Sequence, residues 1–139
     1  MRIFFTALVI ALIPLCANGQ NARKYYKAGA ELVENKKYED AVVQFTNALG
    51  VEPSNPDYYI ARAQVYVRLK KYAEAKSDYE KAIVFDPKNV DALISLGSVC
   101  NRMGSYEEAL KRLNHATAME KRNATVYPCL LYTSPSPRD

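Results

Sequence analysis

The residue types that most often carry chemistry are thinly spread in this chain of 139 residues. His115 is the single histidine, and steps of 34 back along the chain lead from it to Lys81 and Asn47, which are typical of a solvated surface. A metal site or a general-base network needs several convergent donor groups, which this pattern does not supply. We therefore predict that the chain binds no metal or cofactor and is not an enzyme.

The remaining reactive residues have structural explanations. The same steps lead from Cys100 to Tyr66 and Leu32, which favours a small buried hydrophobic residue over a redox role. The carboxylates at 107–108 are typical of the first turn of a helix, where negative charge complements the helix dipole. The triplet that begins at Asn123 fits a glycosylation sequon, and this modification stays open as an alternative. The sequence holds no Gly-rich phosphate loop and no nucleophile elbow.

The charge balance argues against a nucleic-acid partner. The chain has 19 Lys and Arg against 15 Asp and Glu, a net charge of +4. The basic residues are scattered as pairs, such as those at 36–37, 70–71 and 111–112. A nucleic-acid interface would gather them more densely on one face. We therefore predict no nucleic-acid binding.

The first residues have the layout of a secretory signal peptide. Met1 and Arg2 precede an apolar run over residues 3–15, and small residues follow it before Gln20. This run is too short for a stable membrane span, so we predict a signal peptide over 1–19 and an exported, periplasmic or secreted protein. Cys16 leaves open an outer-membrane lipoprotein, although Leu15 stands where a small residue is usual. Membrane association is expected only if Cys16 is lipidated.

The last residues, 129–139, change abruptly to apolar and then Ser/Pro-rich sequence. They resemble the translated read-through of a sequencing-library adapter, so we interpret them as an artefact, with a natural Pro-rich tail as the alternative. Without both ends, residues 20–128 contain one cysteine, Cys100, which excludes an intramolecular disulfide. Stability must then come from packing.

Between these ends, residue types recur at a constant spacing of 34. The period defines a first repeat at 22–55, a middle repeat at 56–89 and a last repeat at 90–123, with 124–128 as the expected start of a fourth in which the coding sequence was cut. The recurring residues are Tyr38, Tyr72 and Tyr106; Ala41, Ala75 and Ala109; Ala48, Ala82 and Ala116; and Asn55, Asn89 and Asn123.

Each repeat has the spacing of two amphipathic helices. In the middle repeat, one apolar stripe runs through Tyr59 and Ala63 and a second through Ala75 and Tyr79, at steps of three or four residues. We predict six antiparallel helices and no strand. We also expect Ala75 to lie at a helix crossing and its neighbour Lys76 to lie in solvent.

The period and its positions resemble the tetratricopeptide repeat (TPR) over about 102 of the 109 retained residues, which is three copies of 34. The resemblance implies an all-α fold, an α-α superhelix or TPR solenoid of three helix-turn-helix repeats. The departures are Lys121 where proline is expected, Cys100 where a bulky residue is usual, and Arg62 before the small Ala63.

The resemblance also implies a site, because the first helices of successive TPR repeats line a concave groove that binds a protein or peptide. Chaperone adaptors in the family clamp a carboxyl terminus with Lys and Asn, but Tyr26, Ala30 and Ala61 stand at those places and exclude this clamp. We expect an interaction module with a scaffold or assembly role; the alternative is the N-terminal adaptor of a longer enzyme or signalling protein. The expected groove residues are Tyr26, Ala30, Ile60, Gln64, Arg68, Ile94, Ser98, Asn101 and Arg102.

Overall fold

The computed structural model describes residues 14–126, with side chains from 19 to 123. Most of the expected signal peptide and all of the interpreted adapter residues lie outside this part of the chain. The described residues form six helices and no strand, which confirms the all-α prediction. The helices are α1 (Pro14–Glu34), α2 (Tyr38–Val51), α3 (Pro56–Arg68), α4 (Tyr72–Phe85), α5 (Val90–Arg102) and α6 (Tyr106–Val126).

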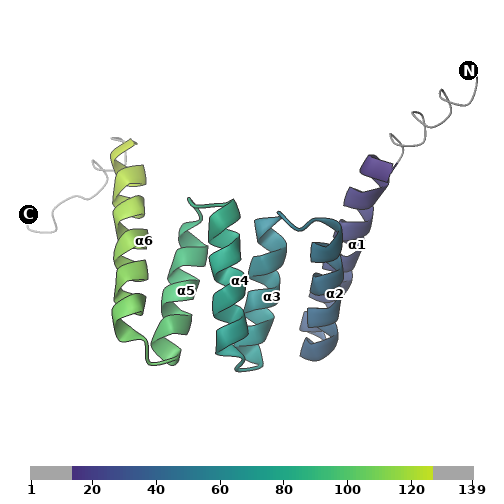
Figure 1. The fold of residues 1–139 in the computed structure, drawn as a ribbon, viewed down its shortest axis with the longest axis horizontal. Coiled ribbons are helices and arrows are strands. Elements are labelled where there is room, and N and C mark those ends of the chain that lie inside the picture. The colour runs from purple at the N-terminus through teal and green to yellow at the C-terminus, as the bar shows by residue number, and fades with distance from the viewer. Residues whose placement is uncertain (1–13, 127–139) are drawn as a thin grey trace, which may run out of the picture.

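The helices pack as consecutive antiparallel hairpins, α1 with α2, α3 with α4 and α5 with α6, and the hairpins stack through α2 with α3 and α4 with α5. Figure 1 shows them side by side in chain order, with α1 and α6 at opposite ends of the row. This is the α-α superhelix that the repeat pattern predicts.

The turn inside each hairpin has the same backbone geometry. Lys36, Lys70 and Gly104 occupy equivalent positions of the three repeats, and all have positive φ, at 60°, 60° and 78°. In each case the amide of the next residue donates to a carbonyl five residues back; for Lys37 and Leu32 the N···O distance is 2.8 Å. This is the Schellman arrangement, which satisfies carbonyls at the end of the first helix. It encodes the hairpin locally.

Recurring asparagines begin the helices that follow each hairpin. The Oδ1 atom of Asn55 accepts from the amide of Asp57 at 3.1 Å, and Oδ1 of Asn89 accepts from the amide of Ala92 at 2.9 Å. Each thereby satisfies one of the free amides of a helix N-terminus. Capping therefore explains the asparagines at 55 and 89, whereas Asn123, the third of the series, lies inside α6.

Small residues allow close helix crossings within the hairpins. A Cβ atom on Gly29 would lie 2.7 Å from the Phe45 ring, and one on Gly97 would lie 2.9 Å from Cγ of Leu113. Ala63, in the equivalent place of the middle repeat, is fully buried. These crossings bury the second helices at Ala41, Ala75 and Ala109.

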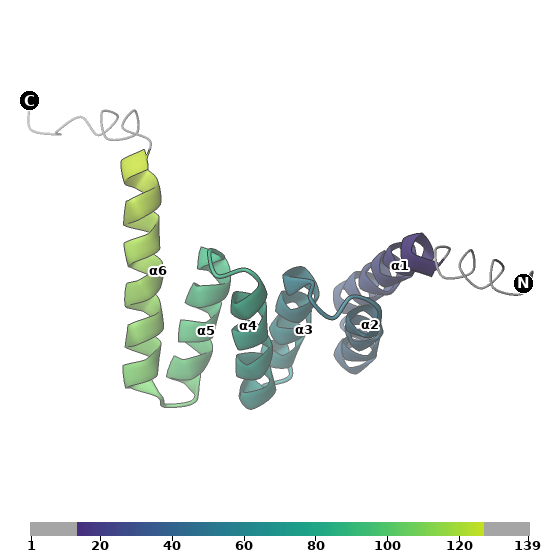
Figure 2. The ribbon, with the colours of Figure 1, turned by 45° about the horizontal axis from the view of Figure 1, so that its top comes forward.

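Helix α6 is longer than its counterparts. The second helices of the first two repeats end before Pro53 and Pro87, whereas α6 passes Lys121, the equivalent position, and continues to Val126. Lysine has the backbone N–H that proline lacks, so nothing local stops the helix. The residues assigned to a fourth repeat fall partly in this extension and partly outside the described residues. Figure 2 shows α6 extending beyond the neighbouring hairpins.

Candidate functional site

Two adjoining hollows between the first helices form the candidate site. The larger has a volume of about 620 Å³ and is lined by Val33, Gln64, Val65, Val67, Arg68, Tyr79 and Arg102. The smaller, of about 310 Å³, is lined by Val67, Tyr79, Ile94, Ser95, Ser98, Val99 and Arg102. Since Val67, Tyr79 and Arg102 line both, we treat them as one surface, the α3–α5 groove.

The structure brings five of the nine expected groove residues to this surface: Gln64, Arg68, Ile94, Ser98 and Arg102. Asn101 is exposed beside them but is not among the lining residues. Ile60 is half-buried and packs against the core beneath. The other two lie on α1, outside the lining of the α3–α5 groove: Ala30 is half-buried, and the Tyr26 ring packs 5.6 Å from that of Phe45.

The floor of the groove was missed by sequence reasoning. Tyr79 comes from α4, a second helix, and is 3% exposed; the sequence pattern assigns it to the hairpin core. Burial raises its pKa, and a hydrogen bond with Ser95 partly opposes that shift. Val67 and Val99 complete an apolar floor. The sequence did hold a signal for the two valines, because Val67 directly precedes the expected groove residue Arg68 and Val99 lies one helical turn before Arg102.

Two guanidinium groups stand over tyrosine rings at the groove. The Arg68 guanidinium carbon lies 6.0 Å from the centroid of the Tyr38 ring, and that of Arg102 lies 5.9 Å from the centroid of the Tyr72 ring. Arginine and tyrosine each recur at a spacing of 34, so one contact is repeated in consecutive hairpins. Such contacts stabilise exposed sites by about 0.5–1 kcal/mol, enough to favour one side-chain orientation.

Other basic side chains serve the scaffold instead. Arg62 on α3 donates to both carboxylate oxygens of Asp78 on α4, at 2.7 and 2.8 Å, and to the hydroxyl of Thr46 on α2 at 3.0 Å. The hydrogen bonds to Asp78 raise the pKa of Arg62. Lys76 on α4 donates to Glu108 on α6 at 2.7 Å, and this bond lowers the pKa of Glu108. Arg62 therefore connects three helices, and Lys76 joins two hairpins.

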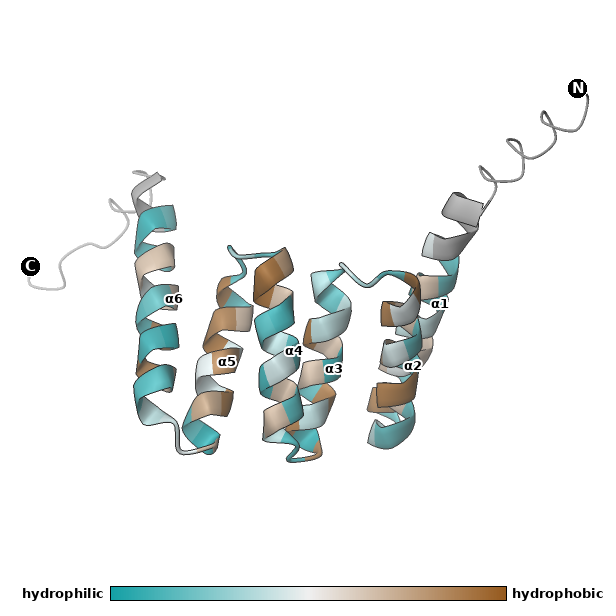
Figure 3. Cartoon of the chain, in the orientation of Figure 1, coloured by the Kyte–Doolittle hydropathy of each residue, from teal (hydrophilic) through white to brown (hydrophobic). Residues whose placement is uncertain are grey.

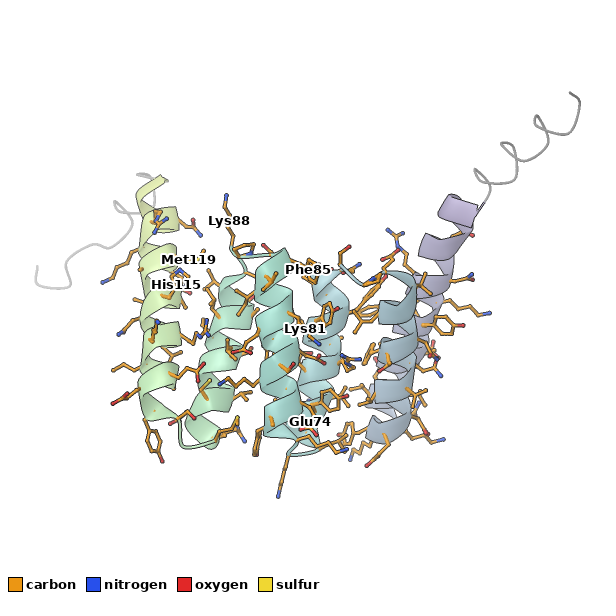
Figure 4. All side chains as sticks on the ribbon, in the orientation of Figure 1. Glu74, Lys81, Phe85, Lys88, His115 and Met119 are labelled. Atoms are coloured by element: carbon orange, nitrogen blue, oxygen red, sulfur yellow. The ribbon has the colours of Figure 1, made fainter. Side chains whose placement is uncertain are left out.

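The residues first considered for catalysis do not converge. His115 is exposed on α6, and Figure 4 shows it one turn from Met119. Cys100 is fully buried in the core with Ala109, and burial raises the pKa of its thiol. Within residues 14–126, no cluster of three His, Cys, Asp or Glu side chains could hold a metal ion. None of the helices described there is long and apolar enough to span a membrane.

Comparisons with known sequences point to one family. The model of the family described as anaphase-promoting complex, cyclosome, subunit 3 matches residues 34–116. Tetratricopeptide repeat protein 16 from Homo sapiens is 38% identical over 47 residues, which is 34% of this chain and 5% of the human protein. The Macaca fascicularis protein of the same name matches equally. The chain thus spans a small part of these curated relatives.

Solved structures share the fold over most of the described residues. MamA superposes with a TM-score of 0.74 at 25% identity, covering 76% of this chain and 61% of that one. The second TPR of Spaghetti (RPAP3), bound to the HSP90 peptide SRMEEVD, superposes with a TM-score of 0.71 at 25% identity. The match covers 77% of this chain and 99% of that one. The TPR2B domain of yeast Sti1 in complex with pHsp70 superposes with a TM-score of 0.70 at 26% identity. The match covers 74% of this chain and 82% of that one.

Proposed function

The chain belongs to the tetratricopeptide-repeat proteins, and on that premise we propose that it binds a segment of another polypeptide in the α3–α5 groove. One observation carries the proposal: five residues that the family resemblance assigns to ligand contact line two hollows that share a floor. A groove with apolar floor and polar walls suits an extended or helical peptide held by its side chains.

Peptide binding is supported by relatives, since Spaghetti and yeast Sti1 have been seen with chaperone peptides or partners. The chemistry of this groove differs from a carboxyl-terminus clamp. Tyr26 and Ala30 stand where lysine and asparagine are required, and the Tyr26 ring is engaged with Phe45 and Tyr58. A different peptide feature must therefore be recognised.

The role that fits best is an exported scaffold or assembly factor without catalytic activity. The signal-peptide layout of residues 1–19 supports export, and the lack of convergent catalytic side chains in the α3–α5 groove supports a binding role. The second candidate is an adaptor region of a longer enzyme or signalling protein. It is favoured by the small share of the curated relatives that this chain spans.

The test is a peptide-display selection against the purified protein and two matched serine variants. Ser98→Trp places a large ring in the smaller hollow, whereas Ser77→Trp places one on the exposed side of α4. We expect selected peptides to bind the wild type and Ser77→Trp alike and to lose at least about tenfold in affinity for Ser98→Trp. Peptides that bind all three equally, or a selection that yields no binder, would contradict the proposed function.

A further inference from the structure

The lining of the α3–α5 groove carries charge of one sign only. Of its residues, Arg68 and Arg102 are charged, both positively, and no aspartate or glutamate is among them. Arg68 lines the larger hollow, and Arg102 lies where the two hollows meet. Both arginines are exposed, and positive charge at the rim of an apolar floor attracts anionic ligands.

Among residues 19–123, Arg68 and Arg102 differ from the ion-paired cations in having no acidic partner. Arg62, Lys76 and Arg112 each form an ion pair with an aspartate or glutamate. Among residues 19–123 no ion pair joins Arg68 or Arg102 to a carboxylate. The guanidinium of each instead lies over a tyrosine ring, and its N–H donors can still pair with a bound anion.

The two guanidinium groups suit carboxylates, and the side chains around them suit a peptide that also carries apolar residues. A guanidinium edge pairs with a carboxylate through two parallel hydrogen bonds. The apolar side chains of Val67, Val99 and Ile94 lie next to the arginines and offer contact to apolar residues of a peptide. A single-stranded nucleic acid would need exposed aromatic rings for base stacking, and the aromatic residue that lines the groove, Tyr79, is 3% exposed.

We propose that the groove recognises an internal acidic stretch of its partner, with one carboxylate side chain on Arg68, another on Arg102, and apolar side chains between them. This inference rests on the proposed function and specifies its ligand class. The stretch is internal because the positions that would hold a terminal carboxylate are Tyr26, Ala30 and Ala61. Recognition depends on two basic residues at the same place in consecutive repeats.

Two variants of equal charge change test the proposal. The first, Arg68→Gln with Arg102→Gln, removes both groove cations. The second, Arg23→Gln with Lys24→Gln, removes two exposed basic residues of α1 that lie outside the α3–α5 groove. A third, Arg68→Lys with Arg102→Lys, keeps the charge but removes the bidentate edge. Circular dichroism and melting curves establish that each is folded before binding is measured.

The measurement is the composition of the selected peptides and their affinity by fluorescence polarisation. We expect the wild type and the α1 variant to select peptides rich in Asp and Glu. The Gln variant should bind them at least about tenfold more weakly, the Lys variant should fall between, and amidating the peptide carboxyl terminus should change nothing. Wild-type affinity should also fall as NaCl rises from about 0.05 to about 0.5 M.

Three results would overturn the inference, and they are distinguishable. Neutral or basic peptides that are blocked by Ser98→Trp but insensitive to the Arg→Gln changes would leave the proposed function standing and remove its acidic ligand. The lack of any groove-dependent peptide would remove both. Polyuridylic acid that displaces the acidic peptides and itself binds more tightly, with the same dependence on Arg68 and Arg102, would replace the peptide with a nucleic acid.

Discussion

The middle and last repeats have nearly the same sequence pattern but differ in what covers their second helices. In the middle repeat, Tyr79 is 3% exposed and Tyr72 lies under the Arg102 guanidinium. At the equivalent positions of the last repeat, Leu113 is 38% exposed and Tyr106 is 69% exposed. The repeat pattern therefore fixes the hairpin, whereas burial of its outer face depends on a following hairpin.

The inner faces of the same two helices are alike, which isolates the cause. Ala75 and Ala82 on α4 are buried, and so are Ala109 and Ala116 on α6. Helix α4 packs on both α3 and α5, whereas α6 packs on α5. In Figure 3, α5 carries several hydrophobic segments while the visible side of α6 is mainly hydrophilic. The difference between the repeats is thus confined to one face.

The largest expected effect compares two ion pairs, Arg62–Asp78 inside the middle repeat and Lys76–Glu108 between the middle and last repeats. Asp78 and Arg62 have side chains 4% and 15% exposed, so Asp78→Ala leaves a largely buried guanidinium without its carboxylate. We expect a loss of about 3–5 kcal/mol in the free energy of unfolding, measured by urea denaturation. Glu108→Ala, which breaks a half-exposed pair with Lys76 at the last repeat, should lower the midpoint far less. Equal shifts would show that the two regions do not differ.

The next effect tests the crossing inside the middle hairpin. Ala75 is fully buried among Ala63, Tyr79 and Leu96, and Ala75→Leu should destabilise by about 1–3 kcal/mol through overpacking. Ala73→Leu, the same change two residues earlier on the exposed side of α4, should be close to neutral. Similar melting shifts for the two variants would mean that the assigned faces are wrong.

A smaller effect compares equivalent glycines. Gly29→Ala places a Cβ 2.7 Å from the ring of Phe45, which is 2% exposed. Gly97→Ala meets Leu113, a flexible side chain that is 38% exposed. Both changes gain helix propensity alike, because both glycines lie inside helices. We expect the free energy of unfolding of the Gly97→Ala variant to exceed that of the Gly29→Ala variant by about 1–2 kcal/mol. Thermal unfolding measures the stability of both variants. The reverse order would contradict the view that Leu113, which is partly exposed on α6, can adjust to the added methyl group.

Much of the architecture could be predicted from the sequence because its determinants are local. Hairpin turns and small residues at crossings depend on residues within one repeat, and each capping asparagine acts on the helix that directly follows it. The period of 34 makes all three recognisable. On α6, Leu110 and Leu113 are exposed, whereas Met119 is half-buried. Met119 lines a small hollow together with Lys88, Arg122 and Asn123.

Contacts between repeats were harder to predict, because no pattern within a repeat specifies them. Lys76 was expected in solvent, but it is half-buried and bonded to Glu108 of the next hairpin. Arg62 was noted as a departure from the family pattern, and only the structure shows it connecting α2, α3 and α4. The groove likewise includes Tyr79, whose role depends on how adjacent hairpins are rotated.

The smallest expected change in stability is also the most direct test of the comparison. Leu110 is 61% exposed on α6, and the equivalent residues are Lys76 and the half-buried Val42. We expect the exposed apolar side chains of α6 to promote self-association. Leu110→Lys should reduce it in sedimentation velocity and should change the free energy of unfolding by less than about 0.5 kcal/mol. Val42→Lys, at the covered counterpart, should be clearly destabilising because a charge enters the core around Phe45.

Hydrogen exchange then locates the effect along the chain. Among the described helices only α5 is a main packing partner of α6, so α6 should open more often than α4 and its amides should exchange faster in the monomer. Joining a copy of residues 56–89 after Asn123 supplies a counterpart of Arg68 for the Tyr106 ring and a hydrophobic face for Leu110 and Leu113. Protection in α6 should then approach that of α4. Uniform protection of both helices in the unextended monomer would contradict the claim that the uncovered outer face of α6, rather than its sequence, weakens the last repeat.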